Sequence, residues 1–103
     1  MQIYMQGDCQ LTPTKKQTGG KLIFKGQDYV VMTGETGHKH RLKVKEKEVE
    51  VYSIGDQTYL NIKGESKLTH EEHGTHLIPA GWYVVEQERE FDYFANSARK
   101  VQD

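Results

Sequence analysis

The chain contains a single cysteine, Cys9, among its 103 residues. One cysteine excludes an internal disulfide and a cysteine-rich zinc site, so we expect Cys9 to be a buried or inert thiol. Apolar residues make up only 35% of the chain, which limits the core of a domain of this size. No apolar run approaches the roughly 18 residues that a membrane span needs. The first ten residues are polar and acidic, unlike a secretory leader. These absences predict a single soluble, cytoplasmic domain over residues 1–103 with no membrane partner.

A basic excess is missing as well. The chain has 14 Lys and Arg residues against 15 Asp and Glu residues, which gives a net charge of −1. A strongly cationic nucleic-acid-binding protein would show a clear excess of positive charge. Nucleic acid is therefore not an expected partner, and a small-molecule substrate or a partner protein is.

Segments of high β propensity alternate with glycine-containing turns along the chain, roughly every 8 to 12 residues, and long helical periodicity is absent. This pattern predicts an all-β fold, a small barrel or sandwich of about seven short strands in one domain. Exposed strand edges in such a protein favour a homodimer. The predicted strands are Gln2–Gln6, Lys21–Phe24, Asp28–Thr33, His38–Lys45, Glu48–Ile54, Thr58–Lys63 and Trp82–Phe91.

The segment His38–Lys45 separates its side chains by kind. Alternate side chains of a strand share a face, so one face carries His38, His40, Leu42 and Val44 and the other carries Lys39, Arg41, Lys43 and Lys45. The apolar pair marks the histidine face as the inner one. We expect Glu48–Ile54 to pair with this strand and to place glutamates opposite the lysines. The basic row is then a neutralised, solvated face; a nucleic-acid stripe is the alternative.

The five histidines fall into two short clusters, His38-Lys39-His40 and the segment His70–His76. An H-x-H pair on a strand places two imidazoles on one face, about 7 Å apart, where two ligands of one metal can lie. Three further histidines, at positions 70, 73 and 76, are spaced to join them. We predict that His38, His40 and His73 bind a metal, with His70 next and His76 as the spare.

The donor set suggests the metal and its chemistry. Imidazole nitrogens suit zinc, copper, nickel and non-haem iron. Three histidines with an open position suit zinc, which turns bound water into hydroxide near neutral pH; two histidines and a carboxylate suit ferrous iron. We therefore expect one transition metal ion, zinc first and iron second, with Glu72 as a general base or a carboxylate that orients a ligand.

Three interpretations of the histidine clusters are compatible with the sequence. The first is a metal-dependent hydrolase or lyase that attacks a small electrophile, as in carbon dioxide hydration. The second is a structural or protein-interaction module without catalysis, in which the histidines serve the fold. The third is a pH switch, because crowded imidazoles titrate near neutrality.

Four segments together resemble a group of small bacterial and phage proteins. Their shared pattern runs T-G-H-x-H, L-T-H-x-E-H, L-P-x-G-x-Y-x-V and Q-R-E-Y, and the early Gly7-Asp8 fits it as well. This chain carries the segments 36–40, 68–73, 78–85 and 88–91 in the same order, with Glu88 in place of Gln and Phe91 in place of Tyr. The resemblance implies that the two histidine clusters form one site, and it is compatible with a phage or prophage origin.

The H-x-H pair and Pro79-Ala80-Gly81 also resemble parts of cupins, small β-barrels that hold a metal with H-x-H, a glutamate and a later histidine. The match is partial. Five residues separate His40 from Glu46 where cupins have three or four, and Val84 stands where a cupin has its last histidine. The resemblance is thus an analogy for architecture alone.

Overall fold

The computed structural model describes residues 2–34, 37–87, 89–92 and 97–100. Its described residues form strands and turns, which confirms the all-β class. The strands are β1 (Tyr4–Gln6), β2 (Cys9–Thr14), β3 (Lys21–Gly26), β4 (Asp28–Thr33), β5 (Lys39–Val44), β6 (Val49–Ile54), β7 (Gln57–Ile62), β8 (Ser66–Thr69), β9 (His76–Ile78), β10 (Gly81–Gln87), β11 (Arg89–Asp92) and β12 (Ser97–Lys100).

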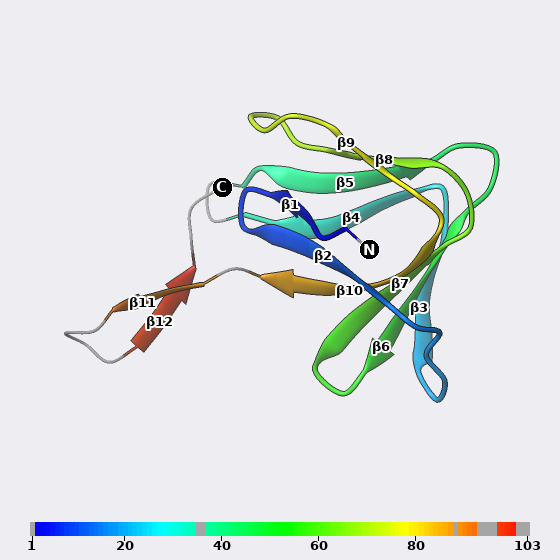
Figure 1. The fold of residues 1–103 in the computed structure, drawn as a ribbon, viewed down its shortest axis with the longest axis horizontal. Helices are drawn as coiled ribbons and strands as arrows, with labels where there is room; N and C mark the ends of the chain where they lie inside the picture. The colour runs from blue at the N-terminus through cyan, green and yellow to red at the C-terminus, as the bar shows by residue number, and fades with distance from the viewer. Residues whose placement is uncertain (1, 35–36, 88, 93–96, 101–103) are drawn as a thin grey trace.

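Two antiparallel sheets form a sandwich rather than a closed barrel. A six-stranded sheet has the order β1-β2-β10-β7-β6-β3, and a four-stranded sheet has the order β4-β5-β8-β9. Figure 1 shows the second sheet above the first, with the hairpin of β11 and β12 standing apart from both. Of the two predicted architectures, the sandwich is therefore the one that forms.

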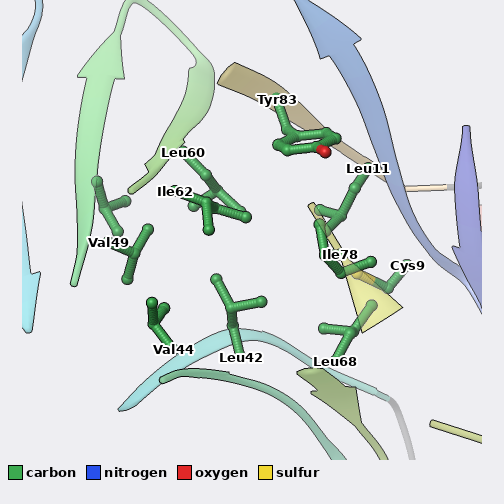
Figure 2. Close-up of a cluster of buried hydrophobic side chains, with 11 residues drawn as sticks. Cys9, Leu11, Leu42, Val44, Val49, Leu60, Ile62, Leu68, Ile78 and Tyr83 are labelled. Carbon is green, nitrogen blue, oxygen red and sulfur yellow. The ribbon is translucent and has the colours of Figure 1, made fainter. Parts of the chain in front are cut away.

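The core lies between the two sheets and takes side chains from both (Figure 2). Its buried members are Cys9, Leu11, Leu42, Val44, Val49, Val51, Leu60, Ile62, Leu68, Ile78 and Tyr83. Burial, together with the neighbouring Asp8 carboxylate, raises the pKa of the Cys9 thiol to about 12. Cys9 is thus a buried thiol in its neutral form, as the sequence predicts, and not a nucleophile.

The sequence pattern locates most strands but misses the short ones. All seven predicted segments contain strand, whereas β2, β8, β9 and β12 have no predicted counterpart. Pro13 lies inside β2, a position that normally argues against a central strand. It is tolerated because β1 pairs only with Cys9–Leu11, so at Pro13 the strand has a neighbour, β10, on one side alone.

The predicted hairpin between His38–Lys45 and Glu48–Ile54 is wrong. β5 pairs with β4 and β8, and β6 pairs with β3 and β7, so the two segments belong to different sheets. The chain crosses from one sheet to the other after β5, through Glu46 in the left-handed region with φ 64°. A two-residue hairpin turn of type I′ would need positive φ at both central residues, and among the described residues Glu46 is the one non-glycine residue with positive φ.

Glu48, just before β6, and Glu50, within it, therefore neutralise other lysines than those predicted. Glu48 lies 3.5 Å from Nζ of Lys25, and Glu50 lies 3.3 Å from Nζ of Lys63. Burial opposes the ionisation of Glu50, but hydrogen bonds from Tyr52, Lys63 and Asn61 outweigh it and lower the pKa of this carboxyl group. The basic row of β5 is left without the partners that the hairpin would have provided.

Candidate functional site

Four of the five histidines come together at one end of the four-stranded sheet. His40 lies on β5, His38 just before it, His70 directly after β8, and His73 in the connection to β9. Because Arg41 of β5 pairs with Thr69 of β8, the two clusters become neighbours. The ring centres lie 5.5 Å apart for His38 and His70, 4.4 Å for His40 and His70, and 4.6 Å for His70 and His73.

These are the four histidines that the sequence analysis selects as ligands. His76, its spare, lies on β9 opposite Leu68 and takes part in none of the ring contacts found among the described residues. His40 is fully buried, whereas the side chain of His38 is 29% exposed. Of the H-x-H pair, only His40 therefore reaches the core face.

His40 is held by polar residues that the sequence analysis did not select. Its Nδ1 lies 2.9 Å from Oε1 of Gln6, whose amide nitrogen donates to the carbonyl oxygens of Leu68 and Gly74 at 2.8 Å each. Both amide hydrogens of Gln6 are thus directed at acceptors. The amide oxygen then faces the imidazole, and Nδ1 of His40 carries the proton of this bond.

The other nitrogen of His40 faces a buried carboxyl group. Nε2 lies 3.2 Å from Oδ1 of Asp8, and the amide nitrogen of Gln87 donates to Oδ2 of the same carboxyl at 2.8 Å. Asp8 and the His40 side chain are both fully buried. Buried polar groups need hydrogen-bond partners, and here the carboxyl group of Asp8 has two, His40 and Gln87.

Two glutamates attach the second histidine cluster to β5. Oε1 of Glu72 lies 3.0 Å from Nδ1 of His38, and the carboxylate of Glu71 accepts a hydrogen bond of 2.9 Å from the backbone N–H of Lys39. Hydrogen bonds from its own backbone N–H and from that of Lys39 lower the pKa of Glu71. Glu72, the predicted catalytic residue, is thus 58% exposed and in contact with a predicted ligand.

His70 and His73 differ in how their ring nitrogens are used. Nδ1 of His70 accepts hydrogen bonds from the backbone N–H groups of Glu72 at 3.0 Å and His73 at 3.2 Å. This resembles a side-chain cap, and it requires an unprotonated Nδ1. Nε2 of His73 is buried and has no hydrogen-bond partner among the described residues. Such an unsatisfied nitrogen costs about 1–3 kcal/mol and calls for a ligand or a water molecule.

The cluster is not arranged as a finished metal site. In the described part of the chain, no three His, Cys, Asp or Glu side chains are placed so that they could hold a metal ion as they stand. Sequence reasoning could find the histidines from their clustering, and Asp8 enters it only through the Gly7-Asp8 pair of the resemblance. Gln6 and Gln87 carry no sequence signal, because an isolated glutamine is common in any strand.

Comparison with known proteins identifies a family for the chain but no chemical activity. A family model described as "Domain of unknown function (DUF8820)" matches residues 5–88, which include both histidine clusters. No curated protein and no solved structure matches the chain. Within the described ranges, no helix is long and apolar enough to cross a membrane.

Proposed function

The chain belongs to the family described as Domain of unknown function (DUF8820), and we propose that its histidine cluster binds one transition metal ion, zinc first and iron second. The observation that carries the proposal is Nε2 of His73, a buried nitrogen without a hydrogen-bond partner among the described residues. It belongs to a ring 4.6 Å from that of His70, which in turn lies 4.4 Å from that of His40. A metal ion would satisfy this nitrogen.

The surroundings of the predicted ligands support the proposal. Nδ1 of His38 faces Glu72, and Nδ1 of His40 faces Gln6. Metal-bound histidines are usually oriented in this way, with one ring nitrogen hydrogen-bonded to a carboxylate or carbonyl oxygen and the other on the metal. Glu72 then acts as the carboxylate that orients His38.

Two distances fit a tetrahedral ion. With bonds of about 2.0–2.1 Å, two ligand atoms of zinc lie about 3.3 Å apart and two bound imidazole centres about 5 Å apart. The separation between Nε2 of His40 and Oδ1 of Asp8 is 3.2 Å, longer than is usual for a charged hydrogen bond. The ring-centre distances of 4.4, 4.6 and 5.5 Å bracket the second value, and each is measured from the ring of His70, to His40, His73 and His38 in turn, so this agreement concerns pairs that include His70.

We therefore propose His38, His40 and His73 as the nitrogen ligands, and the carboxylate of Asp8 as the oxygen donor next to His40. Binding requires His38 and His73, which are partly exposed, to rotate toward Nε2 of His40. His70 is the fourth candidate, and its bonds to the backbone N–H groups of Glu72 and His73 favour a supporting role.

Zinc bound by three imidazoles supplies a Lewis acid that lowers the pKa of a coordinated water molecule to about 7. This chemistry suits hydrolysis or hydration of a small electrophile. Glu72 is placed on the exposed side of the cluster, where it can accept a proton or hold His38 in orientation. A structural role of the metal, in a module that binds a partner protein, is the alternative.

Zinc titration of chelator-treated protein, followed by calorimetry, tests metal binding directly. We expect one site per chain for the wild type and binding at least about tenfold weaker for His73→Ala, because ligands and their supporting groups each contribute that much or more. His76→Ala is the matched control, since it removes a histidine outside the cluster, and it should bind as the wild type does.

Two outcomes would contradict the proposal. One is the absence of saturable binding of zinc, and of ferrous iron under anaerobic conditions. The other is an equal loss of affinity in His73→Ala and His76→Ala, which would indicate nonspecific capture of metal by surface histidines. Saturable binding without turnover of any electrophilic ester or of carbon dioxide would support the metal site and contradict the proposed catalytic activity.

A further inference from the structure

The outer face of the four-stranded sheet carries a concentration of positive charge, which we call the basic face. It consists of Lys39, Arg41, Lys43, Lys45 and Lys67. The first four follow one another along β5 and its end, and Lys67 lies directly opposite Lys43 on β8. All but the half-buried Arg41 are exposed. Like charges placed directly opposite each other in a sheet are destabilising. Asp28, opposite Lys43 on β4, is the one carboxylate among the described cross-strand partners of this row, so the sheet compensates the charge only in part.

The protein itself compensates little of this charge. The glutamates expected opposite the row lie on the other sheet and contact Lys25 and Lys63. Asp28 lies 3.4 Å from Arg41, and Glu65 lines a shallow pocket of about 270 Å³ together with Lys43, Lys45 and Lys67. Arg41 is the one member of the basic face with an ion pair to the described residues. Glu71 also lies beside the row, where its carboxylate accepts from the backbone N–H of Lys39. Five cations thus have three carboxylates beside them among the described residues, in a chain whose net charge is −1.

We propose that the basic face binds the phosphate backbone of duplex nucleic acid without reading its sequence. The side chains of one strand face repeat at about 7 Å and adjacent strands lie about 4.8 Å apart, so the cations form a flat array that suits a regular row of phosphates. The members of the basic face carry ammonium or guanidinium groups and no aromatic ring, so they give unpaired bases nothing on which to stack.

An anionic membrane fits this face less well. Of the large apolar side chains that are exposed among the described residues, only Leu77, at 69%, lies on the four-stranded sheet. Peripheral membrane binding normally combines basic residues with a larger apolar surface that inserts into the lipid. The proposal reverses the expectation from the sequence, which rested on glutamates opposite the lysines and on the net charge. It does not depend on the metal site.

The test is binding of a 20-base-pair duplex by fluorescence anisotropy at several salt concentrations. Each neutralised phosphate contributes about −0.9 to the slope of log K against log salt, so four to five contacts predict a slope of roughly −4 for the wild type. Lys43→Gln with Lys67→Gln should make the slope shallower by about 1.8 and weaken binding at 50 mM salt by roughly ten- to a hundredfold. Two unrelated duplex sequences should bind equally.

Lys15→Gln with Lys16→Gln is the matched control, because it removes the same charge from exposed lysines before β3. This variant should bind as the wild type does. The melting temperature of the Lys43/Lys67 variant should be unchanged or higher, since a like-charge pair is removed. Absence of binding at 100 μM protein in 50 mM salt would overturn the proposal. So would an equal loss in both double variants, or binding to vesicles of anionic lipid with none to DNA.

Discussion

Asp8→Ala is expected to lower the free energy of unfolding by about 2–6 kcal/mol, because two buried polar groups lose their partner and each costs about 1–3 kcal/mol. The substitution leaves Nε2 of His40 without its carboxylate at 3.2 Å and the amide of Gln87 without its acceptor at 2.8 Å. Both Asp8 and His40 are fully buried, so water cannot replace the lost bonds without opening the core. Urea denaturation in the presence of chelator measures this loss independently of any metal.

Two further variants make the Asp8 result interpretable. Asp8→Asn keeps the size of the side chain and an acceptor for Gln87, and it should lose less stability than Asp8→Ala. Asp56→Ala removes an exposed carboxylate in the turn between β6 and β7 and should change stability by no more than about 0.5 kcal/mol. A loss below about 1 kcal/mol for Asp8→Ala would show that the His40–Asp8 contact does not stabilise the core.

Zinc is expected to raise the melting temperature of the wild type by about 10 °C or more. At a free concentration 100 times the Kd, a ligand stabilises the native state by about 2.7 kcal/mol, and for a domain of about 100 residues each kcal/mol corresponds to about 4–8 °C. The stabilisation is expected because the proposed ligands lie on the two segments around β5 and β8, which are brought together only in the folded chain.

Differential scanning calorimetry with zinc, with magnesium and with chelator alone provides the comparison. Magnesium prefers oxygen ligands and should leave the melting temperature unchanged. The shift with zinc should be largely lost in His73→Ala and retained in His76→Ala. An equal shift in these two variants, or none in the wild type, would be incompatible with a metal site in the cluster.

The sequence predicted which way side chains point better than it predicted which strands pair. Alternation along β5 correctly places His40, Leu42 and Val44 inside and the basic residues outside, whereas His38, also expected inside, lies before the strand and is 29% exposed. Alternation does not identify the neighbouring strand, however, and the expected pairing with β6 was wrong because the chain changes sheet at Glu46. The short strands β8 and β9 were missed because three or four residues give too little pattern to recognise.

The sequence indicated which histidines come close to one another, but not which residues hold His40 in place. The spacing of His38, His40, His70 and His73 was enough to expect a common site, and the pairing of β5 with β8 brings their rings together. Gln6 and Asp8 reach His40 from 34 and 32 positions away in the chain, and Gln87 donates to Asp8 from 79 positions away. Contacts of this kind depend on the sheet order, which a single sequence does not contain.

Elemental analysis of the purified, untagged protein, expressed without added metal, tests the central claim most directly. The account predicts close to one zinc or iron per chain in the wild type, retained through dialysis and in His76→Ala, and largely lost in His73→Ala. Metal that is substoichiometric, mixed and removed by dialysis would contradict it, and the histidine cluster would then be a hydrogen-bonded part of the fold.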